Sequence, residues 1–272
     1  KVSPRRIIYA NPCKRNKDIA FALERGIQYT TFDSLCELEK LNRIAPEMKL
    51  ILRLYANDPT AQCILSNKFG AFRNEWESIL QRGRELNMNI VGVSFHVGSK
   101  SSDINAFLTA LDDSLYVFDI AYNMNINLSI LNIGGGFTYK TAKKFYKTIN
   151  DKIDTLFIKN LKYKDITIIS EPGRFFVSSS HTLVVNVIGK KENGEKEFVY
   201  YLNDGMYGSF NCVHFDHAKP IICPFNERNG KVYKSKIFGP TCDSMDKISD
   251  EIYLPELAIG EWCYIENFGA YT

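Results

Sequence analysis

The stretch Leu128–Gly136, LSILNIGGG, joins an apolar run to three consecutive glycines. The run predicts a short buried strand, and glycines after it let backbone amides approach an anion closely. A nucleoside-triphosphate loop would need a Gly-Lys-Ser or Gly-Lys-Thr sequence, and none follows here. If this turn binds a phosphate, that phosphate belongs to another kind of molecule.

The alternation of apolar runs and amphipathic stretches continues on both sides of this segment. Strands are expected at 6–10, 28–32, 49–56, 89–99, 128–136 and 165–170, and helices at 17–26, 34–45, 71–87, 103–125 and 141–160. Asp33 or Ser34 would cap the second helix. Strands that are apolar on both faces are typical of parallel sheets, so we expect a doubly wound sheet or a (β/α)8 barrel. A barrel has eight units, so two would precede Lys1.

The pattern changes after Arg174. Phe175 begins a long stretch that predicts two strands around a polar turn at 192–195. Shorter strand-like pieces follow at 234–240, 251–257 and 261–269, without a strong helix. We therefore expect an incomplete barrel domain at 1–175 and an all-β domain at 176–272, with further sequence beyond both ends.

Composition narrows the classes of function. The net charge of +3 is small, and the basic runs are interrupted, which argues against a nucleic-acid track. Seven cysteines, with no C-x-x-C spacing, argue against a disulfide framework and a structural zinc site. A reducing, cytoplasmic setting is therefore expected. No apolar run approaches the ~20 residues of a membrane helix.

Three successive predicted strands end in residues that could take part in binding or catalysis. The first offers His96 and Ser99, the second Gly134–Gly136, and the third Glu171 and Arg174. Each feature alone has an ordinary structural interpretation, as a tight turn, a core histidine or a surface ion pair. Because the carboxyl ends of barrel strands meet on one face, their joint occurrence favours an active site.

The combination favours pyridoxal phosphate. Glycine amides, the Ser99 hydroxyl and the Arg174 guanidinium suit a phosphate dianion. A buried carboxylate at Glu171 would keep a pyridine nitrogen protonated, and the His96 imidazole would stack on the ring. A sugar phosphate has no ring nitrogen for Glu171 to bind and no aromatic ring on which His96 could stack.

The second domain adds two acidic positions and a cysteine. Asp216 and Asp243 near one pocket would hold a cationic amine. Cys242 could donate a proton, although a buried, inert thiol is the commoner interpretation. His214 and His217 are spaced like metal ligands, but no third ligand accompanies them, and we expect no metal.

Motifs throughout the chain strengthen this interpretation. They are IIYANPCK, TFDS, VGVSFHVGS, IGGGF, EPGR, NDGMYGSFNC, FDHAKP, FGPTCDSMD, LPEL, GEW and ENFGAYT. From about Arg6 to Thr272 the chain resembles the eukaryotic-type ornithine decarboxylase family, which has fold type III and is related to alanine racemase. The resemblance implies a pyridoxal-phosphate barrel, a C-terminal β domain and a head-to-tail homodimer with shared active sites. It also implies decarboxylation of ornithine to putrescine in polyamine biosynthesis and an antizyme-like regulatory partner.

The resemblance also implies individual roles. The implied cofactor-binding residues are Arg53, His96, Ser99, Gly134, Gly135, Gly136, Glu171, Pro172, Gly173, Arg174 and Tyr271. The implied substrate-binding residues are Tyr207, Phe215, Asp216 and Asp243. Arg174 and the Tyr271 hydroxyl would bind the phosphate. Cys242, implied to reprotonate the α-carbon, and Asp243, implied to bind the distal amine, would come from the partner subunit.

Two departures from the family pattern stand out. The family's Schiff-base lysine lies in a YAVK-like motif, which this chain does not contain. Phe215 stands where better-known members have tyrosine, so a hydroxyl contact would be lost there.

Two alternatives stay open. One is a related decarboxylase of lysine, arginine or diaminopimelate; the pair Asp216 and Asp243 favours a simple terminal amine, but pocket length is not readable from sequence. The other is an inactive homologue like the antizyme inhibitors. Those proteins lose cofactor-binding positions, whereas His96, Glu171 and Arg174 are present here.

Overall fold

The computed structural model describes residues 2–163, 165–194, 196–226 and 230–272. The chain forms two compact units, Lys1–Pro172 and Gly173–Thr272. In the described part of the chain, no helix combines the length and apolarity needed to cross a membrane.

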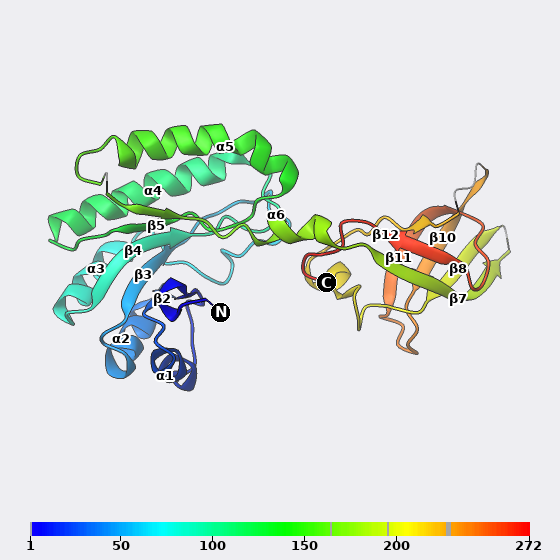
Figure 1. Cartoon of the computed structure of the whole chain (residues 1–272), viewed down its shortest axis with the longest axis horizontal. Helices are drawn as coiled ribbons and strands as arrows, with labels where there is room; N and C mark the ends of the chain where they lie inside the picture. Colours follow the sequence, from blue (N-terminus) through cyan, green and yellow to red (C-terminus); the bar gives the residue numbers. More distant parts are fainter. Residues whose placement is uncertain (1, 164, 195, 227–229) are drawn as a thin grey trace. The chain divides into compact units, whose positions relative to one another are not determined.

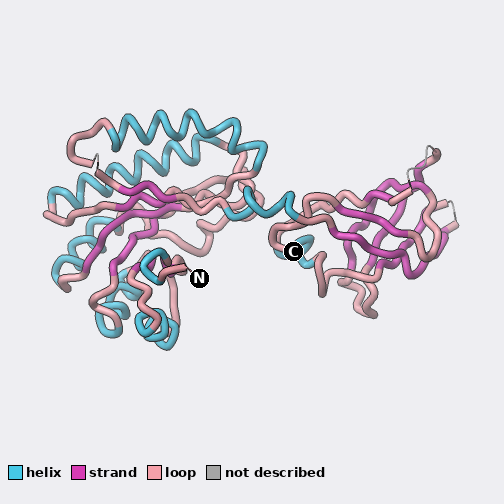
Figure 2. Tube along the Cα trace, viewed as in Figure 1, coloured by secondary structure: helices cyan, strands magenta, loops and turns pink. Residues whose placement is uncertain are grey.

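The first unit is built on one six-stranded sheet, in which every neighbouring pair is parallel and the order follows the sequence (Figures 1 and 2). Its strands are β1 (Ile8–Tyr9), β2 (Tyr29–Phe32), β3 (Lys49–Leu54), β4 (Asn89–Phe95), β5 (Ile130–Asn132) and β6 (Thr167–Ile169). A doubly wound sheet reverses its strand order at a switch point, and this sheet does not. The six predicted strands are thus confirmed, and the unit is an incomplete (β/α) barrel.

One short helix precedes β1, and the others connect successive strands. They are η1 (Pro4–Arg6), α1 (Asn16–Glu24), α2 (Leu35–Ile44), α3 (Trp76–Glu85), α4 (Ile104–Asn123), α5 (Tyr139–Ile153) and the π-helical turn η2 (Asp154–Ile158). The Ser34 side chain caps α2 by accepting from the Glu37 N–H, whereas the Asp33 carboxylate accepts from the Gly70 N–H at 2.8 Å. Of the two predicted caps, Ser34 is therefore the correct one.

The prediction of a helix from residue 71 is wrong at its start. Ala71 forms a parallel bridge with Leu54, and its carbonyl accepts from the Trp76 indole N–H at 2.8 Å. Because Ala71 pairs with the backbone at the end of β3, the helix begins only at Trp76, whose side chain is buried.

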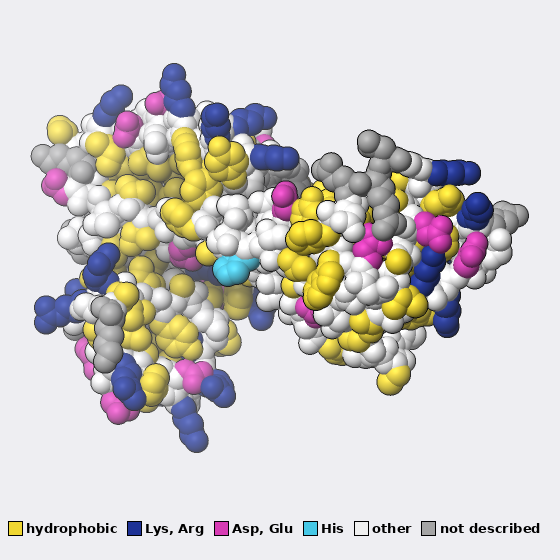
Figure 3. All heavy atoms as spheres, turned by 45° about the vertical axis from the view of Figure 1, so that its right-hand side comes forward, with side chains coloured by type: hydrophobic (Ala, Val, Ile, Leu, Met, Phe, Trp, Pro, Cys, Tyr) yellow, Lys and Arg dark blue, Asp and Glu magenta, His cyan; other side chains and the backbone are white. Residues whose placement is uncertain are grey.

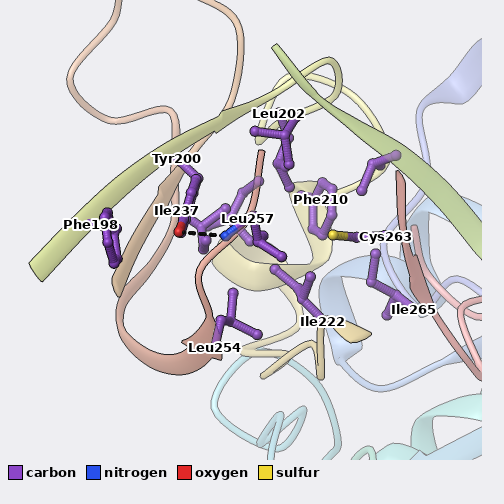
Figure 4. Packing of buried hydrophobic residues seen from close by; sticks show 13 residues of the cluster. Phe198, Tyr200, Leu202, Phe210, Ile222, Ile237, Leu254, Leu257, Cys263 and Ile265 are labelled. Carbon is purple, nitrogen blue, oxygen red and sulfur yellow. Dashed lines mark hydrogen bonds between the residues drawn. The ribbon is translucent and has the colours of Figure 1, made fainter. Parts of the chain in front are cut away.

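The second unit holds a mixed sheet in the order β11-β10-β8-β7-β12-β9, antiparallel except for the β8–β10 pair. Its elements are α6 (Gly173–Val177), η3 (Ser178–Ser180), β7 (Leu183–Asn193), β8 (Glu197–Leu202), α7 (Asn211–Phe215), β9 (Cys223–Pro224), β10 (Val232–Phe238), β11 (Lys247–Pro255) and β12 (Trp262–Ile265). Figure 4 shows its core, where the Tyr200 hydroxyl accepts from the Leu257 N–H at 2.9 Å. An incomplete barrel followed by a β domain is therefore confirmed.

One predicted strand of the second unit begins later than expected, and one predicted turn lies partly outside the described residues. The stretch after Arg174 begins as the short helices α6 and η3, and the strand predicted from Phe175 starts only at Leu183. The serines of η3 favour turns over strands, which explains the delay. The predicted polar turn at 192–195 includes residue 195, which lies outside the described residues.

Candidate cofactor and substrate sites

A layer of polar side chains lies near the carboxyl ends of three strands in the first unit. Arg53 on β3 is in register with Ser94 on β4, and Ser94 with Asn132 on β5, so the three side chains share one face of the sheet. Ser94 and Asn132 are buried. Among the described residues, the buried Arg53 Nε and Ser94 Oγ have no hydrogen-bond partner. Buried polar groups are rarely left so, and these atoms therefore favour a polar occupant.

The glycine turn brings the ends of β4, β5 and β6 together. Gly134 and Gly136 have φ angles of +62° and +98°, which favour glycine. A Cβ on Gly135 would lie 2.5 Å from the Glu171 carbonyl oxygen and 3.1 Å from His96 Nε2. Within the described residues, the N–H groups of Gly135 and Gly136 donate no hydrogen bond. The turn thus offers two amides that can serve an anion.

Asn132 links this turn to the acid. Its Nδ2 donates to Glu171 Oε1 at 2.6 Å, and its Oδ1 accepts from the Gly134 N–H at 3.0 Å. The Glu171 N–H in turn donates to the Gly134 carbonyl at 2.7 Å. Glu171 itself is exposed, so the expectation of a buried carboxylate is wrong for this structure. Glu171 lies just after the end of β6, where the hydrogen bond from Asn132 orients its side chain but leaves it exposed.

His96 is held as a neutral imidazole. Its Nδ1 accepts a hydrogen bond from the Gly98 N–H at 3.0 Å, so Nε2 carries the proton in the neutral ring. Burial, with a smaller contribution from the Arg53 charge, lowers the pKa of His96 to about 4. An uncharged ring beside the glycine turn can stack on an aromatic group at neutral pH.

The remaining predicted residues of this unit have mostly backbone roles in the structure. Ser99 and Cys63 exchange backbone hydrogen bonds. These bonds connect the loop after β4 to the loop between β3 and α3. The Arg53 guanidinium lies 5.2 Å from the Phe69 ring centroid. Burial lowers the pKa of Arg53, while Asp33 and Glu171 oppose that shift.

In the second unit, Arg174 and Asp216 form an ion pair. Arg174 Nη2 lies 2.6 Å from Asp216 Oδ1, and both side chains are about nine-tenths buried. The Arg174 guanidinium also stacks on the Tyr271 ring, 4.6 Å from its centroid. A residue predicted to bind phosphate thus contacts one predicted to bind substrate, a pairing that the sequence did not indicate.

A cavity of about 840 Å³ in this unit gathers most of the predicted substrate residues. It is lined by Met206, Tyr207, Asn211, His214, Phe215, Asp216, Met245, Tyr271 and Thr272. Phe215 is 77% exposed, and Figure 3 shows hydrophobic side chains at the surface of both units. The cavity combines aromatic and methionine side chains with polar ones, and its carboxylate, Asp216, already pairs with Arg174.

Asp243 lies beside this cavity. Its carboxylate accepts from the Tyr207 hydroxyl, and from the Met245 N–H at 2.9 Å. The Tyr207 hydrogen bond lowers the pKa of Asp243, and the same bond raises the pKa of Tyr207. Cys242 is exposed and does not line the cavity.

Comparison with known proteins identifies the family. The model of the pyridoxal-dependent decarboxylase pyridoxal-binding domain matches residues 1–178. The chain belongs to the pyridoxal-dependent decarboxylase family. The cofactor of this family is pyridoxal phosphate, and the free amides, the partnerless Arg53 and Ser94 atoms and the neutral His96 fit it.

The individual relatives of this chain have different names. Ornithine decarboxylase from Cricetulus griseus is 43% identical over 289 residues, which cover 100% of this chain and 63% of that protein. Antizyme inhibitor 2 from Xenopus laevis is 41% identical, with 100% and 63% covered. The crystal structure of the Paramecium bursaria Chlorella virus arginine decarboxylase superposes with a TM-score of 0.93 at 36% identity, covering 100% of this chain and 74% of that one.

Gly135→Ala is expected to destabilise the decarboxylase barrel by about 1–3 kcal/mol, because the new methyl group meets backbone rather than a flexible side chain. Chemical unfolding measures the change. Gly230→Ala, where a Cβ meets nothing within 4 Å, is the matched control. Equal stability of the two variants would contradict the close packing of the turn.

His96 should make unfolding depend on pH. Its pKa falls from the ordinary 6.5 to about 4 in the folded protein, so the unfolded chain takes up the proton first as the pH falls. The stability contributed by the neutral ring is complete above pH ~6.5 and is lost towards pH ~4, by about 3 kcal/mol. In cofactor-free protein, His96→Gln should flatten the dependence over this window. An unchanged slope would show that His96 is not buried as a neutral ring.

Proposed function

We propose that the protein containing this chain decarboxylates L-ornithine to putrescine and carbon dioxide with pyridoxal phosphate. The observation that carries the proposal is the set of hydrogen bonds from Asn132 to Glu171 and to the glycine turn, next to the neutral His96. When bound, the cofactor supplies a ring that accepts the electron pair left by the departing carboxylate. Homology to ornithine decarboxylases supports the same chemistry.

The first unit would hold the ring. Glu171, oriented by Asn132, would accept a hydrogen bond from the protonated pyridine nitrogen and keep it charged. The neutral imidazole of His96 would stack on the ring without repelling that charge. Ser99 and the amides of Gly135 and Gly136 would donate to the phosphate. Arg174 and Tyr271, which were also predicted to bind phosphate, lie in the second unit and contact each other there.

The second unit would hold the substrate. Asp243, whose pKa is lowered by the Tyr207 hydrogen bond, is a carboxylate at neutral pH and would bind the distal ammonium group. Asp216 would bind that amine from its own subunit when its ion pair with Arg174 opens, whereas Asp243 and Cys242 would be supplied by the partner subunit. Cys242 would deliver the proton to the α-carbon after carbon dioxide leaves. We retain a homodimer with shared sites, an antizyme-like regulator and a reducing, cytoplasmic location as parts of the proposal, and the seven free cysteines support the location.

Two other functions have specific support. The relatives include an arginine decarboxylase, so the second unit could accept a longer basic amino acid. They also include an antizyme inhibitor, so the second alternative is a homologue without decarboxylase activity. The glycine turn and Glu171 favour a catalytic protein over an inhibitor-like one, and the similarity to ornithine decarboxylases favours ornithine as the substrate.

The test uses the full-length protein loaded with pyridoxal phosphate. Carbon dioxide release is measured with carboxyl-labelled L-ornithine, L-lysine and L-arginine, and the diamine products are identified by chromatography. We expect the highest kcat/KM with ornithine. A preference for lysine or arginine would change the substrate, and no release from any of them would favour the inhibitor-like protein.

A further inference from the structure

Asp246 is a buried carboxylate that connects two loops of the second unit. It is 1% exposed and lies just before β11. Its Oδ1 accepts from the Met206 N–H at 2.7 Å. Its Oδ2 accepts from the Thr241 N–H at 3.0 Å and from the Thr241 hydroxyl at 2.7 Å. One carboxylate thus joins the loop after β8 to the loop between β10 and β11.

The backbones of both loops pack directly on this carboxylate. A Cβ on Gly205 or on Gly239 would lie 2.2 Å from Asp246 Oδ1. Side chains at these positions would therefore displace the acid. The glycines of NDG and FGP are explained by this close approach, which only a residue without a side chain permits.

The peptide groups of Asp246 also close its own loop. Its carbonyl accepts from the Gly239 N–H at 2.8 Å, and its N–H donates to the Asp243 carbonyl at 3.0 Å. The connected loops carry Tyr207 and Asp243, whose side chains hydrogen-bond to each other on the exposed side. The buried Asp246 and the exposed Tyr207–Asp243 pair thus hold the same two loops together from opposite sides.

We propose that Asp246 is a positioning residue for the decarboxylase, an inference that rests on the proposed function. It fixes the loop that presents Cys242 and Asp243 against the loop that presents Tyr207. Both side-chain oxygens of Asp246 accept hydrogen bonds, whereas an amide at this position would turn a donor towards the N–H of Met206 or of Thr241. Asp246 touches no reacting atom and acts through Cys242, Asp243 and Tyr207.

The experiment compares Asp246→Asn with Asp250→Asn in the full-length protein. Asp250 is an exposed acid on the following strand, so the control removes the same charge without breaking the loop connection. Hydrogen exchange follows the peptides that contain Met206 and Thr241. Peptide-resolved alkylation by iodoacetamide follows Cys242, with the exposed Cys13 as internal reference. Steady-state kinetics with ornithine and cofactor titration complete the set.

For Asp246→Asn we expect exchange at both peptides to quicken about tenfold to a hundredfold, the range set by losing a hydrogen bond to a charged acceptor. The alkylation rate of Cys242 relative to Cys13 should change, and kcat/KM should fall by about the same factor while cofactor affinity stays unchanged. Asp250→Asn should match the wild type. Wild-type exchange, alkylation and kcat/KM in Asp246→Asn would overturn the proposal.

A second pair of variants keeps the proposal testable if Asp246→Asn does not fold. Thr241→Val removes the hydroxyl donor, and Thr241→Ser retains it. We expect faster exchange and lower kcat/KM in the valine variant, with the serine variant within about twofold of wild type. Identical behaviour of the two variants would overturn the role of Asp246. If the wild type releases no carbon dioxide, the proposed function fails, but exchange and alkylation still decide whether Asp246 orders the loops.

Discussion

Replacing Glu171 by Gln is expected to lower kcat for the proposed decarboxylation by about a hundredfold to a thousandfold, the usual effect of removing one electrostatic group that stabilises developing charge. The neutral amide retains the shape of the side chain and can still pair with Asn132. It cannot keep a pyridine nitrogen charged, so the electron pair left by the carboxylate is held less well. Steady-state measurement of carbon dioxide release from ornithine gives the result, with cofactor saturation verified by absorbance.

Two further variants separate the charge of Glu171 from its orientation. Asn132→Leu removes the 2.6 Å hydrogen bond but leaves the acid in place, so it should reduce kcat less than Glu171→Gln does. Glu266→Gln, an exposed acid in the second unit, should have no effect. Near-normal turnover in Glu171→Gln would contradict the role of this carboxylate on the ring nitrogen.

Replacing Lys14 by Met is expected to destabilise the protein by about 1–3 kcal/mol, because it removes the ammonium group from Glu37 Oε1 while Lys40 still pairs with Oε2. The Lys14 ammonium lies 3.0 Å from Glu37 Oε1 and donates to the Thr31 carbonyl at 2.7 Å. It also donates to the carbonyls of Asn11 and Pro12, so it closes the loop between β1 and α1. Burial lowers the pKa of Lys14, and the bond to Glu37 partly compensates.

Denaturant unfolding monitored by circular dichroism tests this prediction. Lys17→Met on the exposed side of α1 is the control and should stay within about 0.5 kcal/mol of wild type. Equal stability of Lys14→Met and the control would contradict a structural ion pair in the NPCK motif.

Periodicity and strand-end chemistry predicted much of this molecule. The βα repeat gave all six parallel strands because buried strands leave continuous apolar runs between amphipathic helices. The same rule brought His96, the glycine turn and Glu171 to adjacent strand ends. Helix starts were less accurate where a tertiary contact decided them, as for Ala71, which pairs with the sheet.

The supporting residues were not predicted because their partners are distant in sequence. Asn132 was visible only as a polar residue inside the apolar run LNIGGG, and its bond to Glu171 spans two strands. Asp246 gave no local signal, since Met206 lies in a different loop. The Arg174–Asp216 ion pair was also not predicted, because sequence alone does not show which ligand or side chain a charged residue contacts.

The most direct test of the central claim is a crystal structure of the full-length protein grown with pyridoxal phosphate. We expect density at the carboxyl ends of β4, β5 and β6, with the phosphate at the Gly135 and Gly136 amides, the ring on His96 and the ring nitrogen at Glu171. Cofactor bound elsewhere, with these groups left in contact with solvent, would contradict it.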